Sequence, residues 1–219
     1  MGTPEADRQP STEDEGRGER PIVAFDFDGT LTTHDSFTAF LRWKAEPLPY
    51  WLGLISLLPH ILAYGVNRDR GRLKAAAAAR FLGGMPAERL AADAESFAME
   101  HAQRMLRPDA VQAWRNWRAQ GALVVIVTAS PETIVRPFAR ALGADLLIGT
   151  RLQLDEAGCV TGRFVGPNCR GPEKVVRLKE AFGDGVILAA AYGDTSGDRE
   201  MLRIAEFPGY RIFKGKPYA

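Results

Sequence analysis

Apolar and polar positions follow one another along most of the chain in an order that predicts strands alternating with helices. Short apolar runs of strand length occupy residues 22–26, 122–128, 145–149 and 186–193. Helix-like patterns lie at residues 131–142, 172–182 and 197–205. This order is typical of a parallel sheet flanked by helices, so the sequence predicts an α/β fold.

Two regions depart from this order. Residues 36–120 contain no strand pattern and are helix-compatible, with stretches such as RLKAAAAARFL and PDAVQAWRNWRAQ. We expect them to form an all-helical cap, inserted after the first strand and lying above the carboxyl ends of the strands, where open α/β sheets bind ligands. Residues 151–165, RLQLDEAGCVTGRFV, alternate about residues 155–158 and predict a small β-hairpin on the edge of the sheet.

Length and composition indicate the domain organisation. The 219 residues are 46% hydrophobic, which is enough for one core domain with an insertion. The first twenty residues are rich in charge and contain no aromatic residue, which predicts a disordered tail over residues 1–20. The core then comprises residues 21–35 and 121–219, and the cap comprises residues 36–120.

Charge and cysteine content narrow the function classes. The chain has 28 Lys and Arg against 27 Asp and Glu, and a net charge of +1 gives no sign of a nucleic-acid-binding surface. Cys159 and Cys169 have neither the spacing of a metal site nor the number needed for a disulfide framework. The N-terminal residues lack the apolar core of a signal peptide, so we expect a cytoplasmic location.

Candidate chemistry begins at residues 21–32, PIVAFDFDGTLT, where an apolar strand runs into two carboxylates. Asp26 and Asp28 are two residues apart, so in extended chain they point the same way, at the mouth of the predicted crevice. One carboxylate can attack a phosphorus atom while the other handles the proton. Taken alone, the same residues also fit a polar turn, because Asp-Gly is a common turn dipeptide.

Three further segments carry complementary groups. VVIVTAS puts Thr128 and Ser130 after a strand, where a hydroxyl and main-chain N–H groups can bind phosphate oxygens. AAAYGDTSGD puts Asp194 and Asp198 after the last recognisable strand, as hard oxygen ligands for Mg²⁺. GPEKVVRL puts Lys174 in the first turn of a helix, where it can neutralise phosphate charge. Each also fits a structural role, as strand end, helix cap or solvated side chain, but their order along the chain favours the chemical interpretation.

Together these segments resemble the haloacid dehalogenase superfamily of aspartate-nucleophile phosphatases. The match comprises DFDGTLT at residues 26–32, VTAS at 127–130, Lys174 in GPEKVVRL, and GDTSGD at 193–198. The resemblance implies a Rossmann-like core and hydrolysis of a phosphomonoester through a phospho-aspartyl intermediate with Mg²⁺.

The resemblance also implies a role for each motif residue. The implied catalytic residues are Asp26 as nucleophile, Asp28 as general acid and base, and Lys174. The implied phosphate-binding residues are Thr128, Ala129 and Lys174. The implied Mg²⁺ ligands are Asp26, Asp28 through its main-chain carbonyl, and Asp194, with Asp198 in support.

Within the superfamily, a helical insertion after the first motif resembles subfamily IB, the group that contains phosphoserine phosphatase. THDSFTAFLRW, the proline in TASPE and the hairpin before GPEKV are more similar to the phosphatidylglycerophosphatase C branch. Phosphoserine phosphatases usually carry a glutamate in place of Asp35 and a glycine pair in the TASP segment, so recognition of an amino-acid substrate does not carry over. His34 and Asp35 are the candidates for substrate contact near the cap.

One apolar segment of the cap bears on the substrate. Residues 49–66, PYWLGLISLLPHILAYGV, carry no formal charge, and basic residues lie before and after them. Their length is at the lower limit for crossing a bilayer, but a single crossing would separate Asp26 from Lys174 and Asp194. Two alternatives remain, a helical hairpin that dips into one leaflet of an anionic membrane and a helix pair packed inside the cap.

The sequence leaves three functions open. The first is Mg²⁺-dependent hydrolysis of a phospholipid monoester such as phosphatidylglycerophosphate, by a protein peripheral to the inner face of the membrane. The second keeps the chemistry but acts on a soluble metabolite phosphate, as phosphoserine phosphatase does. The third is a phospho-accepting signalling domain, which has no use for an acid and base at Asp28.

Overall fold

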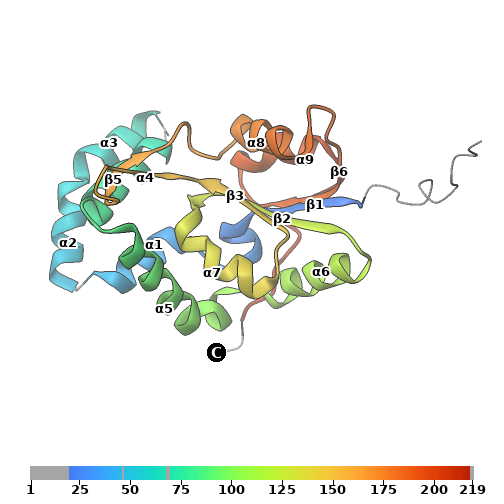
Figure 1. Ribbon diagram of the computed structural model, residues 1–219, viewed down its shortest axis with the longest axis horizontal. Coiled ribbons are helices and arrows are strands. Elements are labelled where there is room, and N and C mark those ends of the chain that lie inside the picture. Colours follow the sequence, from blue (N-terminus) through green and yellow to red (C-terminus); the bar gives the residue numbers. More distant parts are fainter. Residues whose placement is uncertain (1–19, 46, 68–69, 218–219) are drawn as a thin grey trace, which may run out of the picture.

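A parallel sheet forms the centre of the computed structural model, which describes residues 20–45, 47–67 and 70–217 (Figure 1). Over the described residues the main sheet has five strands in the order β3-β2-β1-β6-β7, and all neighbours are parallel. The strands are β1 Ile22–Phe25, β2 Leu123–Pro131, β3 Leu146–Thr150, β6 Leu188–Gly193 and β7 Ala205–Tyr210. The central position of β1 puts its carboxyl end between those of β2 and β6.

Helices cover both faces of the sheet because the strands are apolar on both faces. Phe25 of β1 packs in one cluster with Trp114 and Phe138, whereas Ala24 packs in a second cluster with Leu178. Phe25 and Trp114 have ring centroids 5.0 Å apart. The helices on the Phe25 face are α6 Pro108–Ala119 and α7 Glu132–Leu142, and those on the Ala24 face are α8 Pro172–Phe182 and α9 Arg199–Arg203 (Figure 1).

The remaining helices lie to one side of the sheet, at the left of Figure 1. They are α1 Ser36–Lys44, α2 Pro47–Ser56, α3 Leu58–Asn67, α4 Arg70–Leu82 and α5 Ala87–Met105. The chain leaves the core and returns to it through segments that pair with each other, since Thr32 and Leu106 form an isolated antiparallel bridge. α6 packs on the sheet through Trp114, and the predicted limit of the cap at residue 120 stays a prediction.

The predicted fold class is confirmed, and the predicted strands and the helix at residues 172–182 coincide with observed elements to within one to three residues. The strand β7 was not predicted. The helix expected at residues 197–205 is shorter, with a 3₁₀ turn at Ser196–Asp198 before α9. The predicted disordered tail lies outside the described residues, except for Arg20, which donates a hydrogen bond of 2.8 Å to the carbonyl of Gly121.

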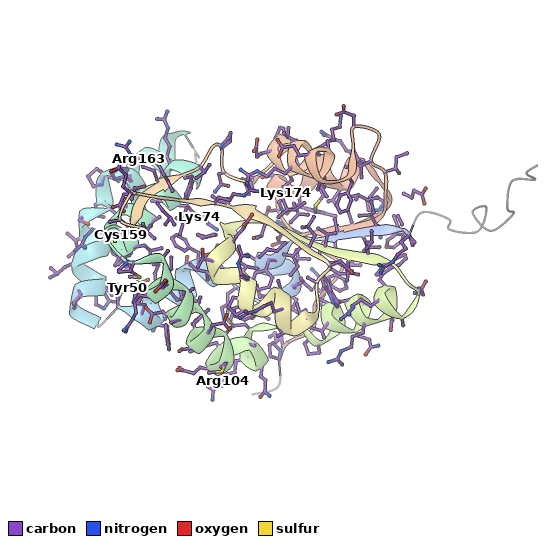
Figure 2. The ribbon with its side chains drawn as sticks, in the orientation of Figure 1. Tyr50, Lys74, Arg104, Cys159, Arg163 and Lys174 are labelled. Carbon is purple, nitrogen blue, oxygen red and sulfur yellow. The ribbon has the colours of Figure 1, made fainter. Side chains whose placement is uncertain are left out.

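The predicted hairpin exists, but the prediction that it lies on the edge of the main sheet is wrong. Its strands β4 Leu152–Leu154 and β5 Val160–Phe164 form a separate antiparallel pair. Val160 exchanges main-chain hydrogen bonds of 2.8 Å with Gly84 and Met85 of the cap, and Figure 2 shows Cys159 at the same end of the molecule as Tyr50. A Cβ on Gly162 would lie 2.2 Å from Cα of Ala79, so a glycine allows β5 to approach α4 this closely.

The apolar segment at residues 49–66 is divided between α2 and α3, with the break at Leu57. Each of these helices has 10 residues. In the described part of the chain, no helix is long and apolar enough to cross a membrane.

Candidate active site

The motif that begins at Asp26 forms a wide helical turn at the carboxyl end of β1. β1 ends at Phe25, and residues Phe27–Leu31 form the turn that follows Asp26. Gly29 has φ +84°, and a Cβ at this position would lie 2.4 Å from Oδ2 of Asp194. Only a glycine therefore lets the turn pass so close to the loop after β6.

Lys174 lies at the centre of a buried cluster beneath this turn. Its side chain is 1% exposed, and its Nζ donates hydrogen bonds of 2.6 Å to Oδ1 of Asp26 and 2.7 Å to Oδ1 of Asp198. A third bond of 2.6 Å goes to the main-chain carbonyl of Val127. One ammonium group on the first turn of α8 thus joins the carboxyl end of β2 to the loops that carry Asp26 and Asp198.

The acids of this cluster differ in their pKa shifts. Burial raises the pKa of Asp26 to about 8, and the charges of Asp198 and Asp28 add to the shift against the opposing charge of Lys174. Burial acts to raise the pKa of Asp198, but the charge of Lys174 and the hydrogen bonds from Lys174 and Thr195 outweigh it, so the pKa of Asp198 is lowered. A second cation beside Asp26 would lower its pKa and favour its ionised form.

Asp26, Asp194 and Asp198 lie close enough together to form an acidic cluster beside a divalent cation. Each offers a carboxylate oxygen, and the three oxygens lie within 4.8 Å of one another. Both oxygens of Asp198 accept hydrogen bonds, from Lys174 and Thr195, but Oδ1 of Asp194 is buried and has no hydrogen-bond partner among the described residues. A buried carboxylate oxygen without a donor, beside a second carboxylate, suits a hard cation such as Mg²⁺. Asp26 and Asp194 are thus the side chains with free capacity for the ion.

Asp28 faces the same cavity but has a different set of partners. Its Oδ1 accepts a hydrogen bond of 2.7 Å from the main-chain N–H of Ser36, and its Oδ2 accepts one from the hydroxyl of Ser130. Burial and the charge of Asp35 raise the pKa of Asp28, while Lys74 and the two serines act in the opposite direction. A carboxyl group with a raised pKa retains a proton that it can give away.

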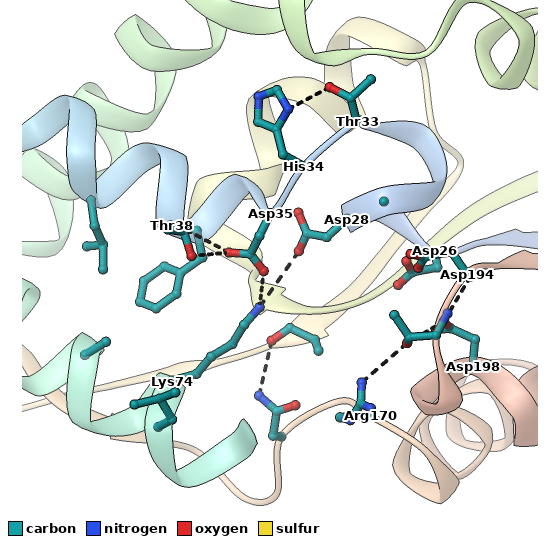
Figure 3. A pocket seen from close by; sticks show the side chains of 18 of the residues that line it. Asp26, Asp28, Thr33, His34, Asp35, Thr38, Lys74, Arg170, Asp194 and Asp198 are labelled. Atoms are coloured by element: carbon teal, nitrogen blue, oxygen red, sulfur yellow. Dashed lines mark hydrogen bonds and ion pairs between the residues drawn. The ribbon is translucent and has the colours of Figure 1, made fainter. Parts of the chain in front are cut away.

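Lys74 of α4 extends from the cap to the two acids of the first motif region, as Figure 3 shows. Its Nζ lies 2.9 Å from Oδ2 of Asp35, 3.1 Å from the hydroxyl oxygen of Ser130 and 3.9 Å from Oδ2 of Asp28. Asp35 also caps α1 by accepting a bond of 2.8 Å from the N–H of Thr38. The sequence indicated Lys74 only as one of the basic residues after the apolar segment, because it lies 46 positions beyond Asp28 and outside any motif.

One cavity of about 760 Å³ contains these groups and continues into the cap. Its polar end is lined by Asp26, Asp28, Asp35, Lys74, Arg170, Lys174, Asp194 and Asp198. Its apolar end is lined by Phe37, Leu41, Tyr50, Leu54, Leu57, Ile61, Leu73, Ala77 and Phe81. The cavity therefore combines a charged site suited to phosphate chemistry with an apolar lining from α1 to α4.

The other predicted residues occupy different positions around this cavity. Ala129 and the exposed His34 line it, and the ring nitrogen Nδ1 of His34 lies 2.7 Å from the hydroxyl oxygen of Thr33. Thr128 is fully buried and does not line the cavity, and its hydroxyl accepts a bond of 3.1 Å from the N–H of Ser130. The phosphate-binding role of Thr128 and the substrate contact of His34 stay predictions.

Two arginines that line the cavity were not predicted. Arg170 precedes α8 and donates hydrogen bonds to the hydroxyls of Thr195 and Ser196, at 3.4 and 3.0 Å. Arg211 follows β7 and donates a bond of 2.6 Å to the main-chain carbonyl of Asp194. Neither lies in a recognisable motif, and the position of Arg211 depends on a strand that the sequence pattern did not reveal.

Comparison with known proteins identifies relatives along nearly the whole length of the chain. A family model for haloacid dehalogenase-like hydrolases matches residues 23–203. Protein CicA of Caulobacter vibrioides is 58% identical over 201 residues, which cover 91% of this chain and 90% of CicA.

Solved structures with the same fold include two with different degrees of similarity. A protein of unknown function from Bordetella pertussis Tohama I has a TM-score of 0.69 and 26% identity, over 84% of this chain and 86% of its own. A substrate-bound phosphoserine phosphatase has a TM-score of 0.59 and 19% identity, over 86% of this chain and 84% of its own. At 19% identity, the similarity to the phosphoserine phosphatase concerns the fold alone.

Proposed function

The chain belongs to the haloacid dehalogenase-like hydrolase family, and from this membership we propose that it is a Mg²⁺-dependent phosphomonoester hydrolase. We further propose that it works through a phospho-aspartyl intermediate on Asp26. Its substrate in this proposal is a phospholipid monoester such as phosphatidylglycerophosphate, as in the phosphatidylglycerophosphatase C branch. The observation that carries the proposal is the single cavity in which Asp26 and Asp28 meet an apolar cap lining.

In the first half of the reaction, a carboxylate oxygen of Asp26 forms a bond to the phosphorus atom as the bond to the alcohol oxygen breaks. Asp28 gives its proton to the departing oxygen, and its raised pKa supports this role. Lys174 holds the other carboxylate oxygen of Asp26 at 2.6 Å, which fixes the direction of attack and balances the negative charge of the site.

In the second half, Asp28 is ionised and takes a proton from a water molecule. The oxygen of this water bonds to phosphorus, the bond between phosphorus and Asp26 breaks, and inorganic phosphate leaves. Asp26, Asp194 and the main-chain carbonyl of Asp28 would hold Mg²⁺. When bound, this ion supplies positive charge that stabilises the phosphoryl oxygens and the carboxylate of Asp26.

The apolar end of the cavity supports a substrate with an apolar leaving alcohol. Leu54 and Leu57 of the cap line it together with Phe81, and they offer no hydrogen-bonding side chain to a sugar or an amino acid. Apolar area removed from water stabilises a bound acyl chain by about 25 cal/mol per Å². A soluble metabolite phosphate is the second candidate, because the ion pair of Lys74 with Asp35 offers both charges to a polar leaving group. The signalling function is not proposed, since the family is one of hydrolases.

Phosphate release from a panel of esters tests this proposal. Phosphatidylglycerophosphate in mixed micelles is compared with glycerol 3-phosphate, phosphoserine and p-nitrophenyl phosphate, each with Mg²⁺ and with EDTA. We expect a kcat/KM for the lipid ester about 100-fold or more above that of the soluble esters, and no turnover in EDTA. A preference for a soluble ester would reject the lipid substrate, and full activity in EDTA would reject the Mg²⁺ dependence.

Two variants separate the chemistry from the substrate preference. Asp194→Asn removes a proposed metal ligand, so we expect it to raise the Mg²⁺ concentration for half-maximal rate by about tenfold or more. Leu54→Ser makes the apolar lining polar, so it should lower kcat/KM for the lipid ester several-fold more than for p-nitrophenyl phosphate. If Leu54→Ser lowers kcat/KM equally for both esters, the leaving alcohol does not bind against the apolar lining at Leu54.

A further inference from the structure

The helices α2 and α3 present large apolar side chains to solvent. We call Trp51, Leu52, Ile55, Leu58 and Leu62 the outer apolar face, and they are 62%, 52%, 59%, 48% and 71% exposed. Five such residues within twelve positions exceed the scattered single apolar residues that are normal on a protein surface. A group of this kind marks a surface that binds an apolar partner.

The opposite side of the same two helices is also apolar. Leu54 and Leu57 line the cavity that contains the catalytic carboxylates, and Leu57 is 5% exposed. Ile61 lines this cavity and is 38% exposed as well. A helix of a water-soluble cap normally needs one apolar side, facing the protein core. α2 and α3 have two such sides, and the outer one is available to an apolar partner outside the protein.

The sequence around the outer apolar face carries an excess of positive charge. Residues 42–80 contain seven Lys and Arg and two Asp and Glu, a net charge of +5, although the whole chain has a net charge of only +1. Lys44 and Lys74 form ion pairs with Asp93 and Asp35, which lie outside this segment, and without these two lysines the segment still has five arginines against two acids. Basic residues that border an apolar helix surface are typical of proteins that bind anionic lipid headgroups. The positive charge also disfavours a second copy of this chain as the partner. A twofold contact through the outer apolar face would bring the positively charged segments of two copies together, and they would repel each other.

We propose that the outer apolar face docks on an anionic phospholipid bilayer, with α2 and α3 lying in the plane of the interface. Ten residues at 1.5 Å each give helices of about 15 Å, which suits insertion into the headgroup region rather than a crossing. The inner side of the same helices then forms the wall between bilayer and cavity. Figure 1 places α2 and α3 at the end of the molecule away from α6, so the core does not obstruct the contact. Docking itself does not depend on the proposed function, but a lipid substrate would gain direct access from it.

Vesicle co-sedimentation tests the docking. The full chain is mixed with two kinds of vesicle, one of phosphatidylcholine alone and one of phosphatidylcholine with about 30% phosphatidylglycerol. The second kind has a strongly negative surface. The triple variant Trp51→Ser, Ile55→Ser, Leu62→Ser removes apolar side chains that do not line the cavity. The matched control, Met99→Ser, Val176→Ser, Ile187→Ser, changes residues that are 82%, 46% and 65% exposed elsewhere on the surface.

We expect the wild-type protein to bind the anionic vesicles, with an affinity about tenfold or more above that for neutral vesicles. The triple variant should lose about tenfold or more of this affinity, and the matched control should retain it. Hydrolysis of p-nitrophenyl phosphate should be unchanged in both variants. Failure of the proposed function would therefore leave the binding result intact.

Two results would overturn the docking proposal. One is equal vesicle binding by the wild-type protein and the triple variant, or no binding by either. The other is a wild-type dimer, detected by light scattering, that the triple variant dissociates without any vesicle binding. This second result would assign the outer apolar face to a second copy of the chain.

Discussion

Lys174 donates a hydrogen bond of 2.6 Å to Asp26 across 148 positions of the chain. The same ammonium group binds Asp198 at 2.7 Å, so the first turn of α8 is fixed to the carboxyl ends of β1 and β6. Burying three ionisable groups together is tolerated only when every charge has a partner. The position of the proposed nucleophile and the stability of the core therefore depend on one side chain.

Replacement of Lys174 by methionine should destabilise the protein strongly. Lys174→Met keeps the volume but leaves Asp26 and Asp198 buried without a cation, which costs about 3–5 kcal/mol in the free energy of unfolding. Urea unfolding followed by circular dichroism measures this loss. Lys179→Met on the exposed side of α8 serves as the control and should change the free energy by less than about 0.5 kcal/mol. Equal stability of the two variants would contradict the role of the cluster.

The Asp26→Asn variant should lose turnover while it keeps the fold. An amide oxygen cannot replace the carboxylate as a nucleophile, so we expect the rate of phosphate release to fall by about 1000-fold or more. Lys174 retains Asp198 and the carbonyl of Val127 as partners, so the far-ultraviolet circular dichroism should be unchanged. Asp184→Asn, at an exposed loop position, provides the control. Near-normal hydrolysis by Asp26→Asn would remove the nucleophile assignment.

Asp109 should make stability depend on pH in the acid range. Its carboxylate accepts bonds of 2.7 Å from the N–H groups of Lys214 and Gly215, and against the effect of burial these bonds lower its pKa. A lowered pKa adds stability that is fully present above the unfolded value of about 3.9 and is lost as the pH falls through the folded value. Asp109→Asn should therefore cost about 1 kcal/mol at pH 7.

Thermal unfolding of wild-type protein and Asp109→Asn at pH 7 and pH 3 checks this sign. The difference between the two proteins should be larger at pH 7 than at pH 3, because the stabilisation begins to be lost below the unfolded pKa and continues to fall through the lowered folded value. A difference that grows as the pH falls would contradict the assignment of these hydrogen bonds to the ionised form.

Gly162 should tolerate alanine less well than Gly166 does. Both have positive φ, +78° and +73°, so both variants incur a similar backbone strain. A Cβ on Gly162 would also lie 2.2 Å from Cα of Ala79, whereas a Cβ on Gly166 meets nothing within 4 Å. Gly162→Ala should therefore lose about 1–3 kcal/mol more stability in urea unfolding than Gly166→Ala. Similar values for both variants would indicate that β5 can move away from α4 at little cost.

The elements that the sequence pattern predicted are those with a local signal. β1 is a run of apolar residues before a motif, and α8 begins at Pro172 and ends before Gly183, so both could be recognised. β7, with the sequence AEFPGY, contains a proline and a glycine and lies at the edge of the sheet, where a proline is tolerated. Its strand geometry comes from pairing with β6 rather than from its own composition.

The site could be predicted only as far as its groups follow strand ends. Asp26 and Asp194 meet as expected because the carboxyl ends of parallel strands converge, and the first turn of α8 brings Lys174 to Asp26. Lys74 lies on a helix of the cap, and no spacing along the chain relates it to Asp28. The contact of the hairpin with the cap depends on Gly162 and on a run of alanines in α4, whose significance is visible only when the two elements are adjacent.

The hairpin has a mechanical consequence for how substrate reaches the site. The chain segments that enter and leave the cap are paired by the bridge between Thr32 and Leu106, which is one attachment of the cap to the core. The hairpin, which follows β3 of the core, fastens the far side of the cap through Val160. A cap attached at both of these places cannot move away from the core as a rigid body unless the hydrogen bonds of Val160 to Gly84 and Met85 break. Loosening of α2 and α3, whose break at Leu57 lies between the two attachments, is the less costly way to admit a ligand.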